Sequence, residues 1–166
     1  MTMTAEQPRS PTRNPDVANL GLVRPPFVYL VALLIGVGLD LVRSSRWLPA
    51  ELGAWVGVPI MIAALALFFS SIRRFKAAGT PVPGNKPATA IVQSGPYRFS
   101  RNPIYLAFSL LLLGVACALN SLWLLGTLAA AMSVMSFVVI PREERFLERR
   151  FGAEYLDYKA KVRRWL

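Results

Sequence analysis

Four long runs of apolar residues constrain what this chain can fold into more than any other feature. They cover roughly residues 25–42, 52–72, 103–119 and 122–140. A helix of about 20 residues, rising 1.5 Å per residue, crosses the hydrocarbon core of a bilayer, which is roughly 30 Å thick. The sequence therefore predicts an all-α, polytopic membrane protein with about four transmembrane helices. The first and third runs are short for a span, so we expect a thinned bilayer or snorkelling arginines at their ends.

The composition agrees with a membrane protein and excludes several classes of site. With 54% hydrophobic residues, 17% charged residues and a mean hydropathy of +0.43, the 166-residue chain is too apolar for a soluble domain. It has no histidine, which excludes His metal sites, His general bases and Ser-His-Asp triads, and we predict no metal site. The single cysteine, Cys117, permits no intrachain disulfide.

The positions of the basic residues predict how the helices are oriented. Only Arg43 and Arg46 lie between the first two runs; every other Lys and Arg precedes the first run, separates the second from the third, or follows the fourth. With four spans these three segments share one side, which the positive-inside rule makes cytoplasmic. We expect an integral membrane protein with both termini in the cytoplasm. The net charge of +10 is then explained by cytoplasmic segments that face an anionic leaflet, and we expect no nucleic-acid partner.

The segments between the runs predict one membrane domain with a short tail. Residues 1–23 are polar, contain prolines and lack apolar periodicity, so we expect a disordered cytosolic tail before a single domain at 24–166. Residues 79–87 (GTPVPGNKP) predict an irregular loop, whereas residues 88–93 are too short and mixed to assign. Asn120 and Ser121 leave little room between the last two runs, which predicts a tight antiparallel hairpin.

Two polar segments, residues 93–105 and 141–165, fall on the same expected side and are the candidate site. Asn102 before Pro103 predicts a helix start, because Asn is a preferred N-cap and Pro fits the first helical position. Pro141 disfavours a helical residue before it, so we expect the fourth helix to bend or break there. Beyond it, apolar residues at helical spacing, interrupted by Gly152, predict an amphipathic helix pair in the cytosol.

Two adjacent carboxylates, Glu143 and Glu144, follow the fourth run directly, where a carboxylate facing lipid is costly. Neighbouring residues on a helix point about 100° apart, so we expect one to enter a pocket and the other to face water or an arginine. The alternative is that both are interfacial charges paired with Arg142 or Arg145.

Basic and aromatic residues supply further candidates, each with a structural alternative. Arg98 and Arg101, near the start of the third helix, suit a carboxylate or phosphate, or anchor the protein to the leaflet. The tyrosines of both segments suit the walls around a flat base or a cation, or an aromatic belt. Asp40, inside the first run, is a functional candidate that we expect to pair with Arg43 at the membrane interface.

Three motifs in order carry a family resemblance. The segment GPYRFSRNPIY (residues 95–105), a hairpin of two helices, Glu143-Glu144 and the pattern FGxxYxxY (residues 151–158) resemble the isoprenylcysteine carboxyl methyltransferase and phospholipid methyltransferase family, in a bacterial-type member. The resemblance runs from about Phe75 to the C-terminus. Asn102 departs from the His of the eukaryotic enzymes, which argues against a His-dependent role, and Leu106-Ala107 stand where some relatives have a glycine that fits against the cofactor.

The resemblance implies an integral enzyme of a bacterial inner membrane that transfers a methyl group from S-adenosylmethionine to a lipophilic or membrane-adjacent acceptor at the cytosolic face. It implies catalytic roles for Arg101, Glu143 and Glu144. The implied cofactor-binding residues are Tyr97, Arg98, Arg101, Asn102, Pro103, Tyr105, Glu143, Glu144, Tyr155 and Tyr158. The acceptor group stays open between a carboxylate, an amine and a thiol. The alternative function is a non-enzymatic membrane protein whose basic cytosolic face binds anionic lipid or a partner.

Overall fold

The structure, a computed structural model, describes residues 24–49, 51–81 and 88–166, and these residues form helices and no strand. The helices are α1 (Pro25–Val42), α2 (Leu52–Ala77), the 3-10 turn η1 (Gly95–Arg98), α3 (Pro103–Ala118), α4 (Leu122–Val134), the π-helical turn η2 (Met135–Val139), α5 (Ile140–Phe151) and α6 (Ala153–Lys161). The all-α prediction is confirmed. The predicted tail at 1–23, and residues 82–87 of the predicted loop, lie outside the described residues.

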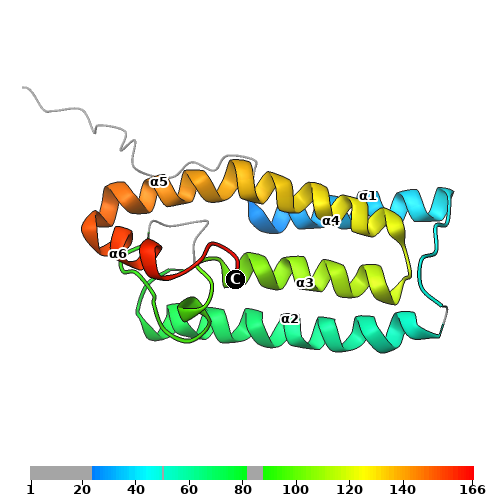
Figure 1. Cartoon of the computed structure of the whole chain (residues 1–166), viewed down its shortest axis with the longest axis horizontal. Coiled ribbons are helices and arrows are strands. Elements are labelled where there is room, and N and C mark those ends of the chain that lie inside the picture. The colour runs from blue at the N-terminus through cyan, green and yellow to red at the C-terminus, as the bar shows by residue number, and fades with distance from the viewer. Residues whose placement is uncertain (1–23, 50, 82–87) are drawn as a thin grey trace, which may run out of the picture.

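The long helices lie side by side along one axis, with α1 against α4 and α2 against α3 (Figure 1). Three helical segments are long and apolar enough to cross a membrane: Pro25–Val42, Leu52–Ala77 and Leu122–Phe151. The apolar helix α3 has 16 residues, a length of about 24 Å, so the third run is short as expected. The protein is an integral membrane protein whose polar segments, the chain between α2 and α3 together with α5, α6 and the C-terminus, gather at one end of the bundle.

Glycines allow α2 and α3 to pack closely. A Cβ at Gly57 of α2 would collide with the carbonyl oxygen of Gly114, and it would lie 2.6 Å from the backbone nitrogen of Ala118. These atoms belong to the backbone of α3, so they cannot rotate away. Small residues at such contacts let two helix backbones approach, which is how helices associate in lipid without a hydrophobic driving force.

The other end of the bundle is closed by the predicted hairpin. Asn120, between α3 and α4, has a positive φ of 53°, a conformation that Asn tolerates better than most residues. Its side-chain oxygen accepts hydrogen bonds from the N–H groups of Trp47 and Leu48 at 3.0 and 2.8 Å. The turn therefore holds the α1–α2 connection as well as its own two helices.

Asp40 is part of this far end and not of the polar end. Its nearest cation is Arg46, at 3.9 Å, and not Arg43 as the sequence predicts. The N–H of Ser45 donates to the same carboxylate at 3.5 Å. Asp40 thus acts as an interfacial anchor for the chain that leaves α1.

Of the two outcomes predicted at Pro141, a bend or a break of the fourth helix, the break is wrong. α4, the π turn and α5 form one continuous helix of 30 residues, Leu122–Phe151 (Figure 1). Ile140 keeps a helical backbone, and its N–H donates to the carbonyl of Met135, five residues earlier. In an α-helical turn the proline ring would clash with the carbonyl four residues before it, whereas the wider π turn relieves that contact. The helix therefore runs without interruption from the membrane into the polar end.

The helix start at Pro103 and the interruption at Gly152 are confirmed, whereas α2 continues to Ala77, beyond the predicted end at residue 72. α3 begins at Pro103 after Asn102, although the side chain of Asn102 makes no cap and instead donates to the carbonyl of Arg164 at 3.0 Å. Gly152, with a φ of 55°, separates α5 from α6. A residue with a side chain would be strained in this conformation, which is why the turn between the two helices falls at this glycine.

We expect the substitution Gly57→Ala to lower the free energy of unfolding by about 1–3 kcal/mol, because the added methyl group overpacks the α2–α3 contact. The matched control is Gly126→Ala on α4, where a Cβ meets no atom within 4 Å among the described residues. That variant should be neutral or more stable by up to about 1 kcal/mol. Chemical denaturation in detergent micelles measures both, and equal effects of the two substitutions would contradict the proposed contact.

Candidate functional site

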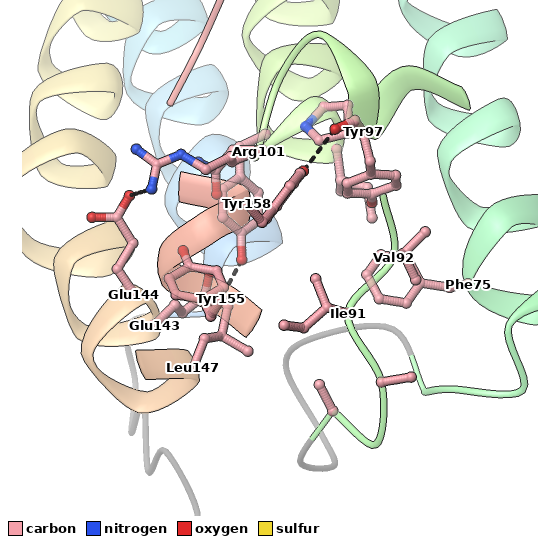
Figure 2. Close-up of a pocket in the computed structure, with 16 residues that line it drawn as sticks. Phe75, Ile91, Val92, Tyr97, Arg101, Glu143, Glu144, Leu147, Tyr155 and Tyr158 are labelled. Atoms are coloured by element: carbon pink, nitrogen blue, oxygen red, sulfur yellow. Dashed lines mark hydrogen bonds and ion pairs between the residues drawn. The ribbon is translucent and has the colours of Figure 1, made fainter. Parts of the chain in front are cut away.

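A pocket lies at the polar end of the bundle and is lined by 16 residues from six parts of the chain (Figure 2). They are Phe75 of α2; Ala88, Ala90, Ile91 and Val92 of the following segment; Tyr97 of η1; Arg101, Asn102, Pro103, Ile104 and Tyr105 around the start of α3; Glu143, Glu144 and Leu147 of α5; and Tyr155 and Tyr158 of α6. The two polar segments that the sequence singles out therefore face one another across one cavity.

The structure brings together nine of the ten predicted site residues. The exception is Arg98, which is exposed and does not line the pocket. It lies in the same turn as Tyr97, whose side chain is buried. The sequence could not separate these neighbours, because a 3-10 turn points successive side chains in different directions.

Glu144 is the charged centre of the site, although only 5% of it is exposed. Nη1 of Arg101 lies 3.0 Å from Oε1 of Glu144. The two groups form an ion pair, but the contact lacks the geometry of a hydrogen bond. On its other side, Nε and Nη2 of Arg164 donate to Oε1 and Oε2 at 3.1 and 2.7 Å. This paired geometry is typical of arginine with a carboxylate, and it balances a charge that would otherwise be costly to bury.

Glu143 also lines the pocket, so the expectation that only one of the two carboxylates enters it is wrong, whereas the expectation that one of them faces an arginine is confirmed by Glu144. The hydroxyl of Tyr105 donates to Oε1 of Glu143 at 2.6 Å. The cavity extends around α5, so side chains that diverge by about 100° both reach it. Within the described residues Glu143 takes part in no ion pair, and neither Arg142 nor Arg145 pairs with these carboxylates.

The four site tyrosines are buried and therefore do not form a lipid-facing belt. The hydroxyl of Tyr158 donates to the carbonyl of Tyr97 at 2.7 Å, which ties α6 to η1. The ring of Phe75 meets that of Tyr97 edge-on, with centroids 5.2 Å apart. Burial raises the pKa of Tyr155 to about 12, and the charge of Glu144 acts in the same direction. Tyr155 is therefore a neutral phenol at physiological pH.

One wall of the pocket is apolar and was not predicted. In Figure 2, Phe75, Ile91 and Val92 lie opposite Glu143, Glu144 and Tyr155. Thr80 holds this wall in place, because its hydroxyl accepts a hydrogen bond from the N–H of Thr89 at 2.9 Å. The short run of small and branched apolar residues between a Pro-rich loop and the Ser-Gly-Pro turn was the available signal. That run has neither helical nor strand periodicity, so it did not allow a prediction.

Arg164 was also missed, since a basic residue three positions from the end of the sequence is ordinarily a solvated charge. The sequence contains no pattern that pairs it with Glu144, 20 residues earlier. Only the fold of the last residues back over α3 and α5 makes that contact possible.

The pocket contains buried polar groups that make no hydrogen bond within the part of the chain that the structure describes. Among the described residues Nε and Nη1 of Arg101 and the hydroxyl of Tyr97 neither donate nor accept a hydrogen bond. Buried polar groups are rarely left in this state unless a ligand or water satisfies them. The Arg101 donors suit a carboxylate and the tyrosine rings suit a cation, so the residues fit a zwitterionic, aromatic ligand such as S-adenosylmethionine.

The helical bundle and this site define an integral membrane protein with a pocket at its polar end. The sequence assigns the family: a model of the phospholipid methyltransferase family matches residues 52–154, from the start of α2 to the start of α6. The chain belongs to this family, which is one of membrane methyltransferases, and the resemblance inferred from the motifs is thereby confirmed.

The chain is similar to several curated proteins. It is 33% identical over 130 residues to the cobalt-zinc-cadmium resistance protein CzcN of Cupriavidus metallidurans, covering 78% of this chain and 54% of that protein. It is 28% identical over 132 residues to the nickel-cobalt-cadmium resistance protein NccN of Alcaligenes xylosoxydans xylosoxydans, covering 79% and 55%. It thus spans about half the length of these two relatives.

A third relative is an uncharacterized protein of Haemophilus influenzae, 47% identical over 64 residues, which are 38% of this chain and the whole of that protein. No solved structure matches the chain. In the part of the chain that the structure describes, no group of three or more His, Cys, Asp or Glu side chains is placed to hold a metal ion.

We expect the substitution Glu144→Gln to lower the free energy of unfolding by about 3 kcal/mol, because it leaves the Arg101 side chain buried without its counter-charge. That side chain is 9% exposed. The matched control is Glu148→Gln, which removes a carboxylate from the partly exposed Lys159 pair on the same helix and should cost less than about 1 kcal/mol. Denaturation in detergent micelles measures both, and similar losses would show that Glu144 is an ordinary surface charge.

Proposed function

We propose that this protein transfers a methyl group from S-adenosylmethionine to a lipophilic or membrane-adjacent acceptor at the cytosolic face of the membrane. The observation that carries the proposal is the set of buried groups on Arg101 and Tyr97 without a hydrogen-bond partner among the described residues, in a pocket whose lining, apart from Tyr155 and Tyr158, falls within the stretch matched by the methyltransferase family. The distribution of Lys and Arg supports a cytosolic position for this end of the bundle.

Each wall of the pocket has a role in binding. Arg101 would bind the carboxylate of the cofactor through its free N–H groups, since a planar guanidinium matches a carboxylate. The faces of Tyr155 and Tyr158 would lie against its cationic part. The apolar wall of Phe75, Ile91 and Val92 would cover the flat base or the hydrocarbon part of the acceptor and exclude water.

The chemistry requires little acid–base help from the protein, which agrees with a chain that lacks histidine. When bound, S-adenosylmethionine supplies a methyl group on a sulfonium, and its displacement depends mainly on in-line positioning. A carboxylate or thiolate acceptor arrives ionised. For an amine acceptor, Glu143 is the carboxylate available to take the proton, because Glu144 is held by two arginines whereas Glu143 accepts only the Tyr105 hydroxyl.

The rival reading, a basic surface that recruits anionic lipid, explains the exposed arginines and not the buried ones. Attraction to a leaflet needs charge near the surface. Arg101 is almost fully withdrawn from solvent and is matched to Glu144, so it contributes little to such a surface. The methyltransferase proposal accounts for why the chain buries this pair.

Isothermal titration calorimetry of the purified protein in detergent tests the cofactor. We expect wild type to bind S-adenosylmethionine, and Arg101→Gln to weaken binding by about tenfold or more, because a charge-assisted hydrogen bond is worth roughly 1.5–3 kcal/mol. Arg98→Gln should bind as wild type does, since Arg98 is exposed and outside the pocket. Absence of binding to wild type overturns the proposal, and equal losses in the two variants overturn the assignment of Arg101.

The acceptor is tested with cofactor that carries an isotopically labelled methyl group. Incubation of wild type with bacterial membranes should move the label into lipid-extractable molecules, which mass spectrometry then identifies. Arg101→Gln at the same cofactor concentration should transfer much less. Label that is found only in water-soluble products would contradict a lipophilic acceptor.

A further inference from the structure

The π turn leaves one backbone carbonyl of the long helix without a helical donor. The N–H of Ile140, which an α-helical turn would direct to Ser136, donates to Met135 instead. The next residue is Pro141, which has no N–H. The carbonyl of Ser136 is thereby free to accept from elsewhere in the chain.

The C-terminal segment supplies the missing donor. Nη1 of Arg164 donates to the Ser136 carbonyl at 3.4 Å, and Nε1 of Trp165 donates to the Ser136 hydroxyl at 3.2 Å. Pro141, which the sequence marked as a helix breaker, instead creates a docking point for residues more than 20 positions later.

The same segment is held on its other side by the start of α3. The N–H of Arg101 donates to the carbonyl of Arg163 at 2.9 Å, and the side-chain amide of Asn102 donates to the carbonyl of Arg164 at 3.0 Å. Residues 163–165, which we call the C-terminal latch, therefore bridge the α4–α5 helix and the segment that carries Arg101.

The latch fixes how Glu144 uses its two oxygens. Arg164 donates a hydrogen bond to each of them. Arg101 contacts Oε1 through Nη1, in an ion pair without a hydrogen bond. If Arg164 were absent, Glu144 would be free to turn and bind Arg101 through two parallel hydrogen bonds, the geometry that these groups prefer. The donors of Arg101 would then be used inside the protein and lost to the pocket.

We infer that Arg164 is a positioning residue: by donating to both oxygens of Glu144, it keeps Nε and Nη1 of Arg101 without a hydrogen bond inside the protein, so that both can donate to the ligand of the pocket. The inference rests on the proposed function only in naming that ligand as S-adenosylmethionine. Arg164 does not itself line the pocket.

Calorimetry with S-adenosylmethionine tests the role of Arg164 in binding. Arg164→Gln should weaken binding by about tenfold, and Arg164→Lys should not restore it, because an ammonium cannot engage both oxygens in a planar fork. Arg149→Gln, which removes the same charge at an exposed position of α5, should bind as wild type does. Equal weakening by Arg149→Gln, or full binding by Arg164→Lys, overturns the inference.

A double-mutant cycle separates positioning from general damage to the fold. In a Glu144→Gln background the substitution Arg164→Gln should cause no further loss of binding, because its effect passes through Glu144. Additive losses in the double variant would show that Arg164 acts by another route, and would overturn the inference.

Hydrogen exchange on the ligand-free protein gives a readout that does not depend on the cofactor. Loss of the latch should expose the N–H of Arg101, so the peptide that contains it should exchange faster in Arg164→Gln than in wild type or Arg149→Gln. Unchanged exchange overturns the latch. If wild type binds no S-adenosylmethionine while exchange accelerates as expected, the proposed function fails and the latch stands; if wild type binds and Arg164→Gln binds equally well, only the inference fails.

Discussion

The structure of the polar end depends on one buried carboxylate. Glu144 lies at 5% exposure on a helix that has just left the apolar part of the bundle, and it stays charged at low cost only because Arg101 and Arg164 flank it. Each arginine comes from a different part of the chain, one from the start of α3 and one from the C-terminus. The ion pairs of this one carboxylate therefore join α5, the start of α3 and the C-terminal segment, and Nε and Nη1 of Arg101 have no hydrogen-bond partner among the described residues.

The long helix from Leu122 to Phe151 makes this arrangement possible. If Pro141 had ended the helix, α5 would have been free to lie on the membrane surface, and Glu143 and Glu144 would have had no fixed height above α3. The π turn accommodates the proline and keeps the helix continuous, and Tyr105 on α3 and Glu143 on α5 lie at hydrogen-bonding distance. The same turn leaves the carbonyl of Ser136 available to Arg164 of the C-terminal latch. The π turn therefore affects both the position of α5 in the pocket wall and the attachment of the latch.

Most of the fold and much of the candidate site could be predicted from the sequence, for reasons that differ between residues. The helix start at Pro103 and the turn at Gly152 follow from backbone chemistry that acts within a few residues. The continuation of the helix through Pro141 does not follow from such local chemistry, because a proline is compatible with either a break or a π turn. Arg98 and Arg101 have the same chemistry three residues apart, and only the direction of the chain around η1 distinguishes the exposed one from the buried one.

The sequence by itself determined that this protein is a helical membrane protein, and its motifs indicated a methyltransferase family, since apolar length and local motifs act along the chain and need no partner. Tertiary structure alone decided which side chains share the pocket. The apolar wall of Ile91 and Val92, the pairing of Arg164 with Glu144, and the inward position of both carboxylates are contacts between segments distant in sequence. Their energies come from burial and from charge pairing in space, and spacing along a chain does not encode which distant groups will meet.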